Sequence, residues 1–319
     1  MIVIRDGDEV PQSARGGVFA IGNFDGVHRG HKALISQTVA EARGKVRPAG
    51  VIVFEPHPRE FFHPEEPHFR LTPLSEKLRL LEALGLDVVV VLEFNAALAG
   101  RTAAGFIDDI LVNWLDVSHV VIGYDFFFGR KRAGTPETMQ LAGQDAGFGT
   151  SIVAQQAEEG EVFSSTAIRL HLAQGDVAGA ALQLGHWWRV SGTVTSGQKL
   201  GRELGFPTAN IILPAATALM HGIFAVRVLV GNKTYGGAAY LGGRPSVDSG
   251  AVRLEVFIFD FDGDLYEQDL PIEFIAFIRD DRRFESLDAL KAQIALDCEK
   301  ARQLLIDAGE APLQNTQLS

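Results

Sequence analysis

Two histidines lie three residues apart in a glycine-rich segment near the start of the chain, residues 22–31, which reads G-N-F-D-G-V-H-R-G-H. An apolar run precedes the segment at Val18–Ile21, and a helical pattern follows it over residues 32–43. Glycines let a backbone turn tightly close to a ligand, and the free N–H groups at a helix start favour phosphate. Because His28 and His31 can face one bound group, the segment predicts a nucleotide triphosphate site. The alternative is a surface turn whose histidines have no chemical role.

Three later segments of the first half add polar groups to this prediction. Residues 54–58, F-E-P-H-P, form a loop that two prolines make rigid. Residues 123–129, G-Y-D-F-F-F-G, place Asp125 among aromatic rings, which either bracket a planar ligand or belong to the core. Residues 163–169, F-S-S-T-A-I-R, begin a helix in which Ser164 or Ser165 is an N-cap. Their hydroxyls and Arg169 are also suited to binding phosphate.

A second group of candidate residues lies in the last third of the chain. Residues 197–210, G-Q-K-L-G-R-E-L-G-F-P-T-A-N, predict an irregular loop. In it Thr208 and Asn210 either offer oxygen ligands for Mg²⁺ carried by nucleotide phosphates, or cap turns of a structural loop. Glu255 lies in an apolar run, where a carboxylate costs free energy unless it is paired. It is therefore either a general base or the partner of Arg253 or Arg244 in an ion pair.

The bulk composition limits the classes of function. The chain has 319 residues, a formal net charge of −11, a pI of about 5.3 and 46% hydrophobic residues, which indicates a globular chain large enough for two domains. The acidic balance argues against a nucleic-acid binder, because such proteins carry a basic face. The single cysteine, Cys298, fits a reducing cytoplasm, and no apolar run reaches the length of a membrane span. We therefore expect a cytoplasmic protein that acts on small molecules.

The order of apolar runs predicts two architectures. Up to about residue 185 short apolar runs alternate with helical patterns, which favours a parallel sheet covered by helices, with ligands at the carboxyl ends of its strands. From residue 188 to 277 strand-like runs with close turns predict a small barrel or sandwich, and an apolar stripe predicts a final helix from about 286 to 308. The expected helices of the first half span 32–43, 75–85, 102–114 and 135–146. The expected strands are Val18–Ile21, Val51–Phe54, Val88–Leu92, Val117–Ile122, Ser151–Val153, Arg189–Thr195, Phe224–Val230, Thr234–Tyr240, Val252–Phe259 and Ile272–Phe277.

The four segments of the first half together resemble the FMN adenylyltransferase family, with matches at residues 22–31, 54–58, 123–129 and 164–169. The resemblance spans most of residues 15–185 and implies a Rossmann-like nucleotidyltransferase domain in which the FMN phosphate attacks the α-phosphorus of ATP. It makes His28 and His31 the catalytic residues. It implies that ATP is bound by Gly22, Asn23, Gly30, Ser164, Thr166 and Arg169, and flavin by Asp125, Phe126 and Phe128. Phe127 departs from the family pattern, which often has Arg there.

The second half resembles riboflavin kinase. The resemblance covers residues 187–307 and is carried by G-F-P-T-A-N at 205–210, by the strand with Glu255, by D-F-D-G-D-L-Y at 260–266 and by F-I-R at 277–279. It implies a small antiparallel β-barrel in which Glu255 takes the proton from the ribityl 5′-hydroxyl. It further implies that Thr208 and Asn210 hold Mg²⁺, that Gly197, Lys199 and Thr208 bind ATP, and that Arg279 binds flavin. Tyr240 and Glu267 depart from the family pattern, which has Asn and Gly at these positions.

The two halves together resemble the bacterial bifunctional riboflavin kinase and FAD synthetase family. Residues 1–186 are then the FMN adenylyltransferase domain, and residues 187–319 are the riboflavin kinase domain. The implied ligands are ATP, riboflavin, FMN and FAD, with Mg²⁺ as the cofactor that accompanies ATP, and we expect a monomer or a weak oligomer. Two alternatives remain open at this point. One is a nucleotidylyltransferase for another small phosphorylated substrate with an accessory barrel, and the other is a non-catalytic flavin-binding sensor.

Overall fold

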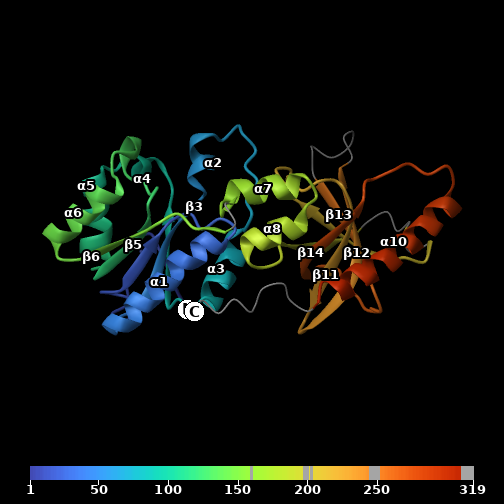
Figure 1. Ribbon diagram of the computed structural model, residues 1–319, viewed down its shortest axis with the longest axis horizontal. Coiled ribbons are helices and arrows are strands. Elements are labelled where there is room, and N and C mark those ends of the chain that lie inside the picture. The colour runs from blue at the N-terminus through green and yellow to red at the C-terminus, as the bar shows by residue number, and fades with distance from the viewer. Residues whose placement is uncertain (159–160, 197–200, 202–203, 244–251, 310–319) are drawn as a thin grey trace. The chain divides into compact units, whose positions relative to one another are not determined.

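The computed structural model describes residues 1–158, 161–196, 201, 204–243 and 252–309, and Figure 1 shows their course. The chain divides into two compact units. Unit 1 comprises Met1–His68 and Thr72–Phe163, and unit 2 comprises Phe69–Leu71 and Ser164–Ser319. The short segment 69–71 therefore packs with unit 2, although the residues on both sides of it belong to unit 1.

Unit 1 is built around a six-stranded parallel sheet in the order β1-β4-β3-β2-β5-β6. The strands are short and mostly buried, as expected for a sheet covered on both faces. Because all six strands run in one direction, the carboxyl ends of the neighbouring strands β3, β2 and β5 meet at the same edge. The strands are β1 (Ile2–Arg5), β2 (Val18–Ile21), β3 (Ala49–Glu55), β4 (Val88–Glu93), β5 (His119–Gly123) and β6 (Gly149–Val153).

Helices cover both faces of this sheet (Figure 1). Along β2, Val18 and Ala20 pack with α1 and α3, whereas Phe19 and Ile21 pack with η1 and α6. This alternation buries both faces of the strand and so fixes where it ends and where the glycine-rich segment begins. The helical elements of unit 1 are α1 (Arg29–Lys45), α2 (Pro58–Phe62), α3 (Leu74–Ala83), α4 (Ala96–Gly100), α5 (Ala103–Gly105), the π-helix η1 (Phe106–Trp114), the 3₁₀-helix η2 (Arg130–Arg132) and α6 (Pro136–Ala146); a two-stranded sheet of β7 (Ala157–Glu158) and β8 (Glu161–Val162) follows.

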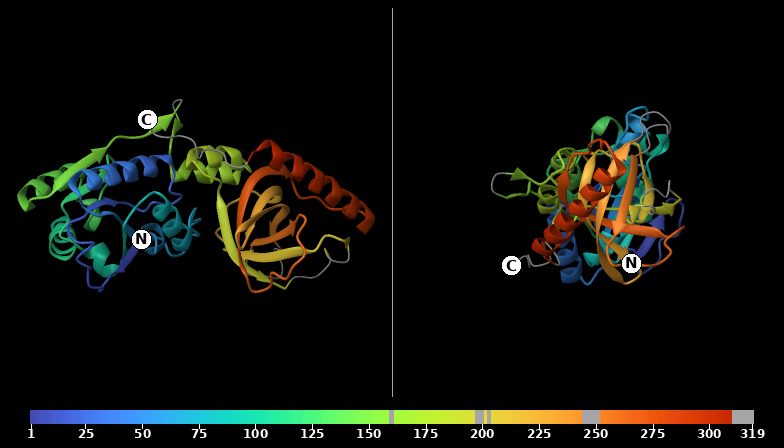
Figure 2. Two further views of the ribbon diagram at one scale, coloured as in Figure 1. Left: turned by 90° about the horizontal axis from the view of Figure 1, so that it is seen from below. Right: turned by 90° about the vertical axis from the view of Figure 1, so that its right-hand side faces the viewer.

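Unit 2 contains a closed antiparallel barrel in the order β10-β13-β12-β11-β14-β9. Along β13, Leu254 and Val256 are fully buried inside the barrel, while Glu255 is half-buried on the outer face. Figure 2 shows α10 (Leu287–Asp307) beside the barrel, where Cys298 and Ala301 pack against it. The strands are β9 (Arg189–Thr195), β10 (Thr208–Leu213), β11 (Gly222–Val230), β12 (Lys233–Gly243), β13 (Val252–Ile258) and β14 (Asp269–Arg279).

Two helices of unit 2, α7 (Ser165–Ala173) and α8 (Val177–Leu184), precede the barrel. Leu172 and Leu184 are fully buried and belong to the same core cluster as Trp188 and Phe274. The indole N–H of Trp188 donates to Leu71 O at 3.0 Å. By packing, α7 and α8 therefore belong with the barrel. The boundary between residues 186 and 187 was predicted for the two functional domains. It is not the same as this packing boundary, and it stays a prediction.

The fold class predicted from the sequence is confirmed, with a parallel sheet, a closed barrel and a terminal helix. All ten expected strands are present, and their ends differ from the prediction by at most three residues. The expected helix at 102–114 divides into α5 and the π-helix η1. The prediction of an irregular loop through residue 210 is wrong at its end, because Thr208–Leu213 is strand β10. Every second residue of this strand is buried in the barrel core, namely Ala209, Ile211 and Leu213. The glycine and proline just before the strand had favoured a loop, so this alternation was missed.

Two candidate active sites

The glycine-rich segment forms the tight connection between β2 and α1. The backbone has positive φ angles at Phe24 (48°) and Gly26 (87°), which ordinary L residues rarely adopt. His28 is the N-cap of α1, and its Nδ1 accepts a hydrogen bond from the His31 N–H at 3.3 Å. A Cβ at position 30 would lie 3.2 Å from the His28 ring, so Gly30 lets the helix begin close to that ring. The predicted strand, turn and helix start are confirmed.

The rings of His28 and His31 are stacked, with centroids 3.6 Å apart and planes inclined by 20°. Burial lowers the pKa of His28 to about 4, and the nearby Asp25 opposes this effect. The pKa of His31 lies well below its usual value, first because of burial and then because of His28 and Lys77. Both imidazoles are therefore neutral at neutral pH. A neutral imidazole can donate and accept hydrogen bonds but contributes no charge.

Two buried polar atoms of this turn have no hydrogen-bond partner among the described residues, namely Asn23 Oδ1 and His31 Nδ1. Buried polar atoms in folded proteins are nearly always paired, so unpaired atoms beside a helix start indicate a place where ligand groups bind. Gly22 lies directly before Asn23, and a Cβ there would approach the Phe24 ring at 3.4 Å. The predicted residues Gly22, Asn23, His28, Gly30 and His31 are thus gathered in one turn.

Thr72 and Lys77 hold this turn from a distant part of the chain. Asp25 Oδ1 accepts hydrogen bonds from the Thr72 N–H at 3.0 Å and from the Thr72 hydroxyl at 3.3 Å. The same hydroxyl accepts from the Gly26 N–H at 2.9 Å. Lys77 Nζ donates to the main-chain oxygen of Asn23 at 2.7 Å. No sequence pattern pointed to Thr72 or Lys77, because 46 to 54 residues separate the bonded partners.

The loops after β3 and β5 begin at the same sheet edge as the turn. His57 is the N-cap of α2. Asp125 is exposed, and Phe126 stacks on Phe128 with ring centroids 5.5 Å apart. Phe128 is only 7% exposed and belongs to the core of unit 1. Asp125 and Phe126 are therefore accessible to a ligand, while Phe128 supports them from behind. The flavin-binding role of these three residues stays a prediction.

The predicted phosphate-binding residues after β8 lie in unit 2. Ser164 is the N-cap of α7, where its Oγ accepts from the Ala167 N–H at 3.1 Å, so the N-cap prediction is confirmed. Thr166 is exposed on the first turn of α7. Arg169 Nε donates to Phe69 O at 2.7 Å within unit 2. The binding of ATP by Ser164, Thr166 and Arg169 stays a prediction.

A second site forms on the outer face of the barrel, where Asn210 of β10 lies directly opposite Glu255 of β13. Glu255 is in turn opposite Tyr240 of β12. Cβ atoms of such paired residues are roughly 4.5–5.5 Å apart. Asn210 Nδ2 donates to Thr208 Oγ1 at 3.4 Å. A hydroxyl, an amide and a carboxylate from Thr208, Asn210 and Glu255 are thus adjacent on one half-buried face.

Arg279 ends β14, and its guanidinium is held by a residue that the sequence did not suggest. Its Nε and Nη2 donate to the carboxylate of Asp297 over 2.7 to 3.1 Å. Asp297 is 5% exposed on α10. Flavin binding by Arg279 stays a prediction, as does ATP binding by Gly197 and Lys199, which lie outside the described residues.

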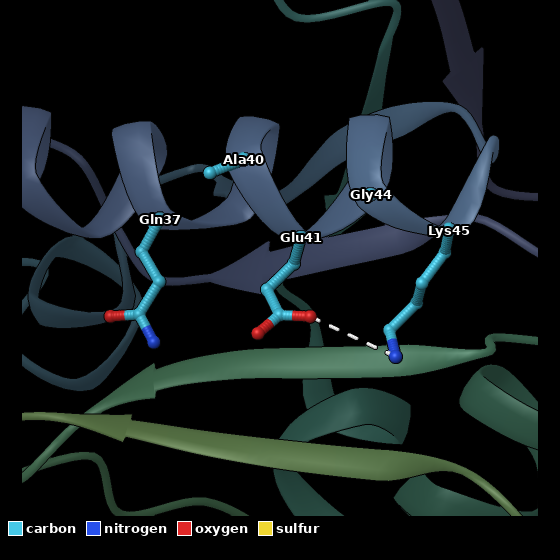
Figure 3. Close-up of a pocket in the computed structure, with 5 residues that line it drawn as sticks. All are labelled: Gln37, Ala40, Glu41, Gly44 and Lys45. Carbon is cyan, nitrogen blue, oxygen red and sulfur yellow. Dashed lines mark ion pairs between the residues drawn. The ribbon is translucent and has the colours of Figure 1, made fainter.

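A shallow depression on unit 1 lies along α1 (Figure 3). Glu41 and Lys45 form an ion pair there at 3.7 Å. Both residues also affect the pKa of His119, which is lowered mainly by burial. His119 is the first residue of β5 and so lies at the edge of the sheet opposite to the carboxyl ends of the strands. None of the predicted site residues lines this depression. Its lining residues are Gln37, Ala40, Glu41, Gly44 and Lys45.

The histidine-bearing turn on a parallel sheet and the barrel face with Thr208, Asn210 and Glu255 are the arrangement expected of a two-module transferase that uses nucleotides. Family models match both parts: FAD synthetase over residues 10–167 and riboflavin kinase over residues 184–305. The bifunctional riboflavin kinase/FMN adenylyltransferase of Escherichia coli K12 is 42% identical over 94% of this chain and 96% of its own length. The protein of the same name from Pseudomonas fluorescens is 41% identical over 95% of this chain and 98% of its own length. The chain belongs to the family of bifunctional riboflavin kinases/FMN adenylyltransferases, as its motifs predicted.

A solved structure supports the fold over the same length. A crystal structure titled as a macrolide-efflux protein from Streptococcus pneumoniae matches with a TM-score of 0.85 and 29% identity, over 95% of this chain and 99% of that chain. No helix in the described ranges combines the length and the apolar character that crossing a membrane requires.

Proposed function

We propose that the chain phosphorylates riboflavin to FMN and then adenylylates FMN to FAD, with ATP as the donor in both reactions. The observation that carries the proposal is that each unit holds its own polar site. Unit 1 has the neutral pair His28 and His31 beside unpaired buried atoms, and unit 2 has Glu255 next to Asn210. Membership of a family whose curated relatives are named for both activities supports the assignment.

Adenylyl transfer at the turn of unit 1 needs no general base. An ionised phosphate oxygen of FMN forms a bond to the α-phosphorus of ATP, and the bond from that phosphorus to the leaving pyrophosphate breaks with its electron pair. Positioning and charge stabilisation therefore account for the rate. We assign His28 and His31 to hydrogen bonding with the phosphates. Gly22, Asn23 and Gly30 shape the ATP site, and Asp125 and Phe126 contact the flavin with Phe128 behind them.

Phosphoryl transfer on the barrel needs a base, because the attacking group is an alcohol. Glu255 would accept the proton of the ribityl 5′-hydroxyl while that oxygen bonds to the γ-phosphorus of ATP and ADP leaves. Thr208 Oγ1 and the side-chain oxygen of Asn210 are hard ligands of the kind that Mg²⁺ prefers, and the two side chains lie within 3.4 Å of each other. With the Asn210 amide turned so that its oxygen faces the same side as the hydroxyl, these two residues would hold a magnesium ion that arrives with ATP and neutralises its phosphate charge. Riboflavin would lie where Glu255 reaches its hydroxyl.

The test is incubation of the purified chain with riboflavin, ATP and Mg²⁺, followed by chromatography of the flavins. FMN and FAD should both appear. The double variant His28→Ala/His31→Ala should accumulate FMN and make no FAD, because the substitutions lie in unit 1 and the kinase residues in unit 2. Riboflavin that is bound but unchanged would instead identify a sensor. A folded double variant that loses kinase turnover and retains adenylyl transfer would overturn the assignment of the sites.

A further inference from the structure

Lys77 is a buried cation on α3, with a relative exposure of 4%. Burying an ammonium group away from water costs free energy, so lysines are almost never fully buried without polar partners. The partner that the geometry shows is the turn of unit 1: Nζ donates to the main-chain oxygen of Asn23 at 2.7 Å. The charge is thus fixed behind the candidate phosphate site.

The contact fixes the backbone of Asn23 and leaves its side chain available. Asn23 Oδ1 is buried without a partner among the described residues, as is His31 Nδ1. Lys77 is also close enough to His31 to contribute to the lowering of its pKa, after burial and His28. The charged group that acts on His28 is Asp25, which opposes the lowering of the His28 pKa by burial. Lys77 therefore acts on both groups of the turn that have unpaired atoms.

We propose that Lys77 is a positioning residue for adenylyl transfer, which holds Asn23 in place and sets a fixed positive charge beside the two imidazoles. The inference rests on the proposed function of the turn. Negative charge moves onto the leaving pyrophosphate during the reaction, and neutral imidazoles cannot balance it by charge. A cation in a dry site acts more strongly on such charge than one at the surface. The same cation adds to the effects of burial and of His28, which lower the pKa of His31 and keep its ring neutral and able to exchange hydrogen bonds with the nucleotide.

The test is the pH profile of FAD formation from supplied FMN in Lys77→Met, with the urea unfolding midpoint of unit 1 as the check on the folding of that unit. We expect the FAD rate to fall roughly 10²–10³-fold, as for other removed electrostatic groups, with kinase turnover unchanged. The acid limb of the profile should move to higher pH, because His31 without its cationic neighbour takes up a proton more readily. Lys45→Met is the matched control in the same unit: Lys45 is paired with Glu41 at 3.7 Å, and the two side chains are 43% and 35% exposed. That variant should behave as the unaltered chain.

A second variant separates the charge from the hydrogen bond. Lys77→Gln retains an N–H donor for the Asn23 oxygen, so this variant should fold even if Lys77→Met is unstable. It should show the same shift of the acid limb. A normal rate and an unmoved limb in either variant overturn the proposal. A uniform loss of rate without a shift of the limb also overturns it, because it assigns Lys77 a purely structural role. Undiminished FAD formation in His31→Ala is a different failure, which rejects the proposed site itself.

Discussion

The ion pair between Arg279 and Asp297 should be a main determinant of the stability of unit 2. Asp297 lies on α10 and accepts from Arg279 Nε at 2.9 and 3.1 Å and from Nη2 at 2.7 Å. Gln293 Nε2 adds a fourth hydrogen bond at 2.8 Å. The pair thereby joins the end of β14 to the terminal helix. Asp297→Asn preserves the shape of the side chain but leaves the Arg279 guanidinium without its counter-ion.

The size of the effect follows from burial. Removing one partner of a buried ion pair costs about 3–5 kcal/mol, because the remaining charge stays poorly hydrated. The Arg279 side chain is 19% exposed and that of Asp297 is 6% exposed, so partial access to water favours the lower end, about 3 kcal/mol. For a domain of this size 1 kcal/mol corresponds to roughly 2–4 °C in Tm. We therefore expect the Tm of unit 2 to fall by roughly 6–12 °C.

The assay uses tryptophan fluorescence during thermal and urea unfolding. Trp187 and Trp188 belong to unit 2, whereas Trp114 belongs to unit 1, so a Trp114→Phe background reports unit 2 alone. The matched control is Asp260→Asn, because Asp260 accepts two hydrogen bonds from Arg302 of α10 at 2.8 and 3.1 Å but is 77% exposed. Exposed pairs contribute little, so this variant should show no resolvable shift. Equal shifts in the two variants, or none in Asp297→Asn, would refute the reasoning.

Three further predictions concern both units. Glu255→Gln should reduce FMN formation by roughly 10²–10⁴ while FAD formation from supplied FMN continues, and a normal kinase rate would show that Glu255 is only structural. Burial lowers the pKa of His28 from 6.5 to about 4. Between these two pH values the unfolded chain binds more protons than the folded chain, so the free energy of unfolding of unit 1 should fall by about 3 kcal/mol as the pH is lowered through this range. A flat urea midpoint for unit 1 would contradict this, and His28→Gln should reduce the slope. A fragment that starts near residue 185 should make FMN but no FAD. A longer fragment that starts at Ser164 should unfold at a higher urea concentration than the shorter one, because α7 buries Leu172 on the barrel core. Equal urea midpoints of the two fragments would show that this packing does not stabilise unit 2.

Elements whose hydrophobic pattern is complete within one segment were predictable from the sequence. Strand Val18–Ile21, buried at all four positions, has the expected ends, and α10 begins after Ser286, whose hydroxyl accepts from the Ala289 N–H at 3.2 Å as an N-cap. Strand β1 was not predicted, because it has four residues and most of them are exposed. Its place in the sheet is set by pairing with β4, more than eighty residues away. Such pairing leaves no mark on the local pattern.

The local structure of the turn at 22–31 was predictable for the same reason, since the segment carries its own glycines and its own helix start. What surrounds the motif was not predictable. The family often has Arg where this chain has Phe127, yet the guanidinium of Arg132 lies 5.0 Å from the Phe127 ring centroid. A cation therefore reaches that position from another residue. The ion pair of Arg279 with Asp297 was equally hidden in the sequence. Asp297 lies on α10, and the apolar stripe of that helix predicts only packing.

The protonation of the histidine pair shows most clearly why residue types alone do not define a site. In the sequence His28 and His31 flank Arg29 and give the impression of a cationic cluster. Folding stacks the two rings and takes them largely out of water, and this desolvation lowers both pKa values and makes the rings neutral. Neutral rings leave the positive charge of the proposed phosphate site to other groups. Arg29 lies in the same segment, and the fold adds a buried cation on a helix that begins more than forty residues later. The chemistry of the turn is therefore completed by Lys77, which is bonded to Asn23 across 54 residues of sequence.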